Sequence, residues 1–138
     1  MSIAAAITQQ LLATDPVTNL IEQRLYPQYN YQTMKVYPLA VYRVENVSPL
    51  ICNDGPTGFE TADYVVDCLG EKFADADAVA DAIQTALDGA RGTWSGMDIQ
   101  GIFMKEDGRH SDTLSEPQTE QILYFIQTLT FNVAYSNS

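Results

Sequence analysis

Residues 119–135 form a long segment in which apolar side chains recur at every second position. Such alternation is typical of a strand that buries one face, and Gln127 is the one break in the apolar parity. The segment has 17 residues, whereas a typical strand has about 5–6. The sequence therefore predicts a strand that must bend or pass from one sheet neighbour to another. The apolar residues of this parity are Leu123, Phe125, Leu129, Phe131, Val133 and Tyr135.

Residues 73–87 have the apolar spacing of an amphipathic helix. Gly89 follows them as an expected helix stop. The apolar stripe consists of small residues, which suits close packing on a sheet. The apolar positions are Ala76, Val79, Ala80, Ile83 and Leu87, and the polar face carries Asp75, Asp77, Asp81, Gln84 and Asp88.

Two short helices are expected at the N-terminus. Ser2 can cap the first, while Asp15-Pro16 ends it and starts the second. Besides the segment 119–135, strands are predicted over residues 38–45, 59–69 and 97–105.

Two segments lack this regularity. Residues 46–58 are rich in Pro, Asp and Gly and predict a long loop or a hairpin with an irregular tip. Residues 106–118 contain Leu114 as their one apolar residue and predict a solvated, mobile loop. The resulting order, α-α-β-β-α-β-β, predicts one α+β domain over residues 1–138. Its expected form is an antiparallel sheet of about four strands with the helices packed on one face.

The composition is strongly acidic, with 18 Asp and Glu against 7 Lys and Arg and a formal net charge of -11. A surface with few cations is unsuited to gripping phosphates, which disfavours nucleic-acid binding. Uncharged runs are too short or too polar to cross a bilayer, and the N-terminus lacks the positive region of a secretory signal. We expect a soluble acidic domain with Cys52 and Cys68 as reduced thiols, a single disulfide being the alternative.

No catalytic, metal or cofactor site is predicted. The run Arg109-His110-Ser111-Asp112 sets His, Ser and Asp side by side, but the groups of a triad converge from separate elements. Two Cys and one His are too few for a structural zinc site. Counted from Asp75, the acidic helix lacks the glycine and glutamate of a calcium loop. We therefore expect a protein that is not an enzyme and that needs no cofactor.

Several segments become informative when their order is considered. The chain contains, in sequence, LLATDPVTNLIEQRLYPQ with the corner Arg24-Leu25-Tyr26-Pro27, then YPLAVYRVEN, TADYVVDCLGEKFADADAVADAIQTALDG and EPQTEQILYFIQTLTFNVAY. This order, over about residues 7–135, resembles the bacteriophage tail completion family, also called tail terminator or tail-to-head joining proteins. The segment 46–58 is longer than in that family, and the helix over 73–87 is more acidic.

The resemblance implies a structural virion protein of the tail or neck, assembled in the host cytoplasm. It implies a homo-hexameric ring that caps the tail tube, stops its polymerisation and joins it to the head connector. The implied partners are the tail tube protein and a head connector or neck protein, with DNA passing through the ring unbound and no membrane involved. Six touching spheres of ~18 Å radius, the size expected for this chain, leave a hole roughly 36 Å across.

Two candidate surfaces follow from this picture. An acidic lumen would repel moving DNA, so the acidic helix face is the candidate lining, with a solvated outer face as the alternative. Its residues are Asp75, Asp77, Asp81 and Asp88. The predicted loop is the candidate interface between rings, through Asp107, Gly108, Arg109, His110, Ser111, Asp112, Thr113, Leu114 and Ser115.

Other functions fit the same residues. A head-closure or neck adaptor ring would have a similar composition, and a small cytosolic enzyme or ligand-binding α+β domain would need a pocket of converging polar groups. An acidic mimic of DNA would need carboxylates spaced like phosphates, whereas these cluster on one helix. The sequence does not specify the phage, the type of tail, which face meets which partner, or whether the ring forms in solution.

Overall fold

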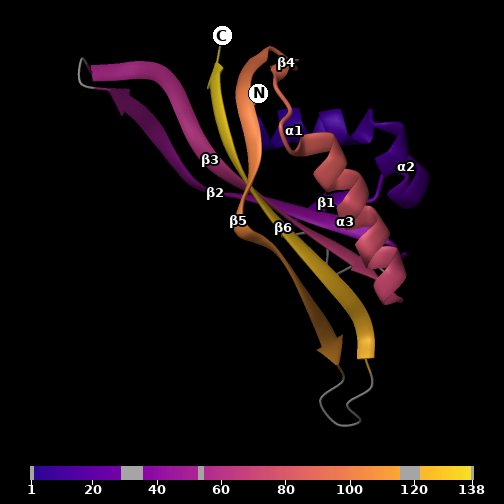
Figure 1. The fold of residues 1–138 in the computed structure, drawn as a ribbon. Helices are drawn as coiled ribbons and strands as arrows, with labels where there is room; N and C mark the ends of the chain where they lie inside the picture. The colour runs from indigo at the N-terminus through magenta and orange to yellow at the C-terminus, as the bar shows by residue number, and fades with distance from the viewer. Residues whose placement is uncertain (1, 29–35, 53–54, 116–121, 138) are drawn as a thin grey trace.

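The protein is built around one six-stranded sheet in the order β1-β2-β3-β6-β5-β4 (Figure 1). The computed structural model describes residues 2–28, 36–52, 55–115 and 122–137. Neighbouring strands are antiparallel, except that β1 runs parallel to β2. The elements are α1 (Ile3–Leu12), α2 (Asp15–Ile21), β1 (Leu25–Pro27), β2 (Leu39–Cys52), β3 (Gly55–Gly70), α3 (Phe73–Leu87), β4 (Gly92–Trp94), β5 (Met97–Ser115) and β6 (Ile122–Asn137).

The expected antiparallel sheet of about four strands, in the order α-α-β-β-α-β-β, is therefore wrong. The sheet is mixed and strongly curled, and it has two additional edge strands, β1 and β4. Each of these strands has three residues, which is too short to leave a period in the sequence. Their pairing with β2 and β5 is a tertiary contact that local patterns do not encode.

The predicted loop over 106–118 is also wrong as far as residue 115, because β5 continues to Ser115. Residues 116–118 lie outside the described chain. The segment 46–58 takes the hairpin form of its prediction, since β2 and β3 pair across most of it. β6 is long, as expected, and twists along its whole length in Figure 1.

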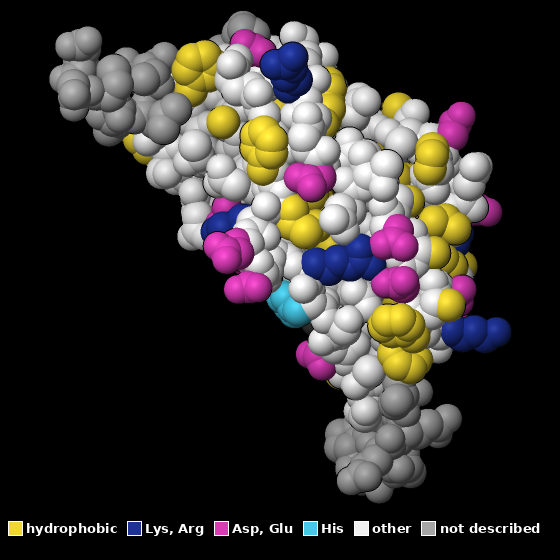
Figure 2. Space-filling model, viewed as in Figure 1, with side chains coloured by type: hydrophobic (Ala, Val, Ile, Leu, Met, Phe, Trp, Pro, Cys, Tyr) yellow, Lys and Arg dark blue, Asp and Glu magenta, His cyan; other side chains and the backbone are white. Residues whose placement is uncertain are grey.

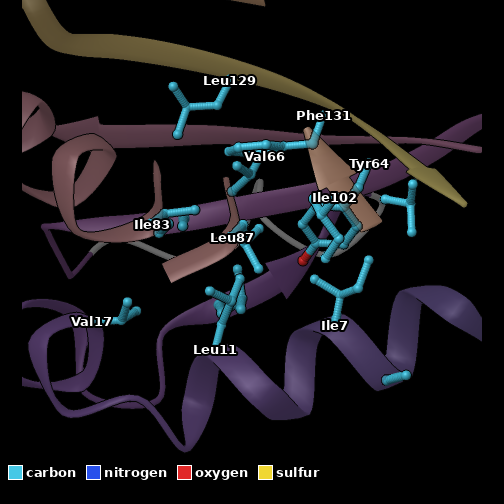
Figure 3. Packing of buried hydrophobic residues seen from close by; sticks show 14 of the residues in the cluster. Ile7, Leu11, Val17, Tyr64, Val66, Ile83, Leu87, Ile102, Leu129 and Phe131 are labelled. Atoms are coloured by element: carbon cyan, nitrogen blue, oxygen red, sulfur yellow. The ribbon is translucent and has the colours of Figure 1, made fainter. Parts of the chain in front are cut away.

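All three helices lie on one side of the sheet, and the main core fills the space between them (Figure 1). The predicted apolar face of α3 is confirmed, because its five apolar positions are the residues that the helix buries. Figure 3 shows Ile7 and Leu11 of α1 pointing toward Leu87 of α3 and Ile102 of β5. Burial of this apolar surface is the main favourable term in folding.

The predicted helix ends are largely confirmed. Ser2 caps α1, since its side-chain oxygen accepts a hydrogen bond from the Ala5 N–H at 3.1 Å. Pro16 lies in the first turn of α2, although the N-cap residue is Thr14. Gly89 follows α3 with φ +82°, a left-handed conformation that favours glycine.

β5 is interrupted by a bulge at residues 105–108, which lie at the level of Thr130 of β6. A Cβ added to Gly108 would stand 2.7 Å from the carbonyl oxygen of Lys105 and 2.7 Å from that of Thr130. Only glycine allows this close approach of three backbone segments. Beyond the bulge β5 resumes pairing with β6, and we call residues 109–115 the outer β5 segment.

Candidate functional site

Arg109 joins the two candidate surfaces that the sequence analysis kept apart. It is the first residue of the outer β5 segment, and its guanidinium reaches α3. Nη2 donates to Asp77 Oδ1 at 2.6 Å, and Nη1 donates to Asp81 Oδ1 at 2.7 Å and to Gln84 Oε1 at 2.8 Å. One side chain from the sheet edge thus holds three residues spread over two turns of the acidic helix.

Gln127 of β6 continues this arrangement into the sheet. Its Oε1 accepts from Arg109 Nε at 3.5 Å, and its Nε2 donates to Ser111 Oγ at 2.7 Å. Gln127 is only 3% exposed. A buried amide is tolerated when its polar atoms are hydrogen-bonded, so these contacts account for the one break in the apolar parity of β6.

The charges in this cluster keep Arg109 cationic. Burial alone would lower the pKa of Arg109, but the hydrogen bonds and charges of Asp81 and Asp77 outweigh it and raise the pKa above its ordinary value. The Asp77 and Asp81 side chains are 40% and 64% exposed, so salt screens both ion pairs. The contribution of the cluster is therefore mainly geometric, since a guanidinium fork fixes the direction of its partners.

The predicted acidic face is not uniformly free to line a lumen. Arg109 pairs with Asp77 and Asp81, and Asp88 Oδ1 accepts a hydrogen bond from the Met104 N–H at 2.9 Å. Asp75 is exposed in the first turn of α3. Figure 2 shows acidic side chains at several separate places on this side of the molecule. An open groove beside the cluster is lined by Asp81, Gln84, Thr85, Asp88 and Arg109.

The predicted interface residues lie on a strand, which fixes their directions. Asp107 and Gly108 belong to the bulge, and Gly108 is buried. In the outer β5 segment alternate side chains point to opposite sides, so Arg109, Ser111 and Thr113 face the helix side. His110, Asp112 and Leu114 face the other side, and residues 110–115 are exposed.

The neighbours His110, Ser111 and Asp112 do not converge, because Ser111 lies on the opposite side of the strand from the other two. Within the described residues, no group of three His, Cys, Asp or Glu side chains could hold a metal ion. Among the described helices, none has the length and apolar character needed to cross a bilayer. Cys68 is a free, buried thiol whose pKa is raised by burial, and the side chain of Cys52 lies outside the described set.

A second polar cluster, on the helix-free side of the sheet, surrounds Asp63. This carboxylate is 5% exposed and accepts hydrogen bonds from Asn46 at 2.8 Å, Lys105 at 3.1 Å and Asn132 at 3.3 Å. Burial alone would raise the pKa of Asp63, but these hydrogen bonds and the Lys105 charge lower it. This cluster is not predicted from the sequence, although Asp63 and Asp67 alternate with the core residues of the strand predicted over 59–69.

Arg43 organises the same side of the sheet farther along. It donates to Glu45 at 2.6 Å and to Asp67 at 3.3 Å, while Thr128 donates to Asp67 at 2.7 Å. Beside it lies a small apolar cluster, built on buried Leu39, Val41 and Leu69 with Tyr26, Tyr37, Tyr124 and Ile126 packed around them.

Comparisons with known proteins show which family this chain belongs to. No curated protein matches the chain. A chain from the virion of a native gene transfer agent particle is similar in structure, with a TM-score of 0.75 and 20% sequence identity over 97% of this chain and 94% of that one. The model of the family described as tail completion protein gp17 matches residues 5–127. Since this match spans most of the sequence, the chain belongs to the gp17 family of tail completion proteins, a structural family and not a class of enzymes.

Proposed function

We propose that six copies of this chain form a ring that caps the tail tube, stops its polymerisation and joins the tail to the head connector. Membership of the tail completion family supports this place in the virion. The structurally similar chain belongs to a gene transfer agent virion, which supports a place in a virion as well. Assembly would take place in the host cytoplasm, before the tail meets the head.

The observation that carries the proposal is the open edge of β5. Within the described chain, β4 covers β5 at Met97–Ile99, and Ile102 and Met104 bond to residues 88–90, so the edge from residue 105 to 115 has no strand beside it. An open edge presents unpaired backbone N–H and C=O groups, to which another strand can add. In the proposed complex, the outer β5 segment with residues 107 and 108 meets the last ring of the tube.

The charge of the chain fits a passage for DNA. Each copy carries a formal net charge of -11, so a ring would repel phosphates and let DNA pass without specific binding. We retain the acidic face of α3 as the proposed lumen lining. Because Arg109 offsets one of the two charges of Asp77 and Asp81, Asp75 and Asp88 carry most of the repulsion on this face.

The ring is tested by the mass of the protein in solution, measured by light scattering behind size exclusion over a range of concentrations. A discrete species of six times 15.3 kDa supports it. A stable dimer contradicts it. If the protein is a monomer, the same measurement is repeated after addition of short tail tubes, and failure to assemble on them contradicts the ring.

Capping is tested by polymerising the tail tube protein with and without this chain and measuring tube lengths by electron microscopy. We expect the wild-type chain to shorten the tubes and Leu114→Arg, on the outer β5 segment, to lose this effect. Val47→Arg is the matched control, because Val47 is also an exposed apolar residue but lies on β2. Unchanged tube lengths with wild type contradict capping, and equal loss in both variants contradicts the assignment to the β5 edge.

A further inference from the structure

Apart from Leu114, which is exposed on the helix-free side, the outer β5 segment is polar on both of its sides. Its residues 110–115 are all exposed, and no large apolar side chain on it faces the core. The inner half of the same strand differs, because Met97, Ile99 and Ile102 are buried there. Strand register is set by the apolar pattern where one face is buried and is weakly specified where both faces are polar.

The bulge at residues 105–108 uncouples the outer segment from the register of the inner half of β5. Three residues more than the partner strand requires are accommodated there, so the inner half does not dictate how the outer half pairs with β6. A slip of one residue would turn every side chain of the outer segment to the opposite side of the sheet.

Arg109 is the residue of this segment whose side chain makes hydrogen bonds and ion pairs to α3 among the described residues. It binds Asp77, Asp81 and Gln84 on the helix and Gln127 on β6. These contacts form in the register in which Arg109 lies opposite Leu129 and points to the helix side. We propose that Arg109 is a positioning residue that fixes the pairing register of the outer β5 segment. The importance of this register for capping rests on the proposed function, in which the outer β5 segment is the edge presented to the tube.

The register is tested on the isolated protein by hydrogen exchange of the amides in residues 109–115 and by cross-strand NMR contacts between Arg109 and Leu129. In Arg109→Gln we expect protection of these amides to fall roughly tenfold or more, as hydrogen bonds to charged groups are lost. Protection in β3 and α3 should stay at the wild-type level. Unchanged protection and cross-strand contacts in the outer segment would overturn the proposal.

Arg43→Gln is the matched control, because Arg43 also makes two carboxylate contacts and is similarly exposed, but on the helix-free side. It should leave the outer segment protected. The double variant Asp77→Asn with Asp81→Asn keeps Arg109 and removes its ionic partners, and it should reproduce the effect of Arg109→Gln. If Arg43→Gln exposes the segment equally, or the double variant does not, the register does not depend on the Arg109 contacts.

Tube capping separates this inference from the proposed function. If wild type does not shorten tubes, the proposed function fails, while the exchange result still decides the role of Arg109. If wild type caps and Arg109→Gln loses both register and capping, the inference is supported through to function. If Arg109→Gln loses register but caps normally, the register is not needed for capping, and that part of the proposal is overturned.

Discussion

The two sides of the central strand pair, β3 and β6, are held by different forces although they alternate along the same residues. On the helix side, Tyr64 lies opposite Phe131 in an apolar core. On the helix-free side, the neighbouring pair is Asp63 opposite Asn132, and the contacts are directional hydrogen bonds. Apolar burial is roughly additive in area and tolerates shifts in position, whereas a buried carboxylate tolerates none because each lost partner leaves a charge unsatisfied. The helix side thus supplies most of the stability and an apolar pattern that sets the register, and the helix-free side adds directional contacts that hold the same alignment.

Phe131→Ala should give the largest effect that follows from this difference. Phe131 is fully buried between the sheet and the helices, so its removal leaves a cavity. We expect a loss of about 3–5 kcal/mol in the free energy of unfolding, measured by chemical denaturation. Asn132→Ala changes the next residue, which is exposed and faces the other side, and the loss of one of three donors to Asp63 should cost about 1 kcal/mol. Equal losses in the two variants would remove the distinction between the sides.

Ala80→Leu tests how tightly α3 is packed on the helix side. Ala80 is fully buried in the small-residue stripe of α3, where a larger side chain has no space. We expect a destabilisation of roughly 1–3 kcal/mol from overpacking. Ala74→Leu, on an exposed position of the same helix, is the control and should change the unfolding midpoint little. A neutral Ala80→Leu would indicate a loosely packed helix.

Asp63→Asn tests the helix-free side through its dependence on pH. The native pKa of Asp63 lies below its ordinary value, so its ionised form adds stability that is present above the unfolded pKa of about 4 and is lost as the pH falls through the lower native pKa. At pH 7 we expect the variant to be about 1–2 kcal/mol less stable, because one of the donors loses its acceptor.

The difference in the free energy of unfolding between wild type and Asp63→Asn should therefore shrink when chemical denaturation is repeated from pH 6 down to pH 3. A difference that stays constant with pH would mean that the charge of Asp63 contributes nothing and that only its shape matters.

The same contrast separates what the sequence predicts from what it does not. The buried face of α3 and the parity of β6 follow from apolar spacing, because burial on the helix side leaves a period in the sequence. The outer β5 segment leaves none, since it is polar on both sides and is a strand only through its pairing with β6. It was accordingly predicted as a loop.

The candidate site was predicted in part. Asp77, Asp81 and Arg109 were each named from the sequence, but in two separate surfaces with different roles. Their pairing requires the bulge and the curl of the sheet, which bring residues 28 and 32 positions apart into contact. No local pattern encodes a contact of this kind. Gln127 was the sequence feature that indicated this site, because a polar residue in an otherwise apolar series needs hydrogen-bond partners when it is buried.

The smallest expected effect compares the loss of one hydroxyl on each side of the sheet. Thr8 Oγ1 lies 3.2 Å from the hydroxyl of fully buried Tyr64, and Thr128 donates to Asp67, whose side chain is 24% exposed. Thr8→Val leaves the Tyr64 hydroxyl without this partner where water has no access, and should cost about 1 kcal/mol. Thr128→Val leaves a carboxylate that water can reach and that Arg43 still contacts, so its cost should stay below about 0.5 kcal/mol. Parallel denaturation of the two variants measures the difference directly. If Thr128→Val proves the more costly, the helix-free side depends on its hydrogen bonds for stability as well as for alignment.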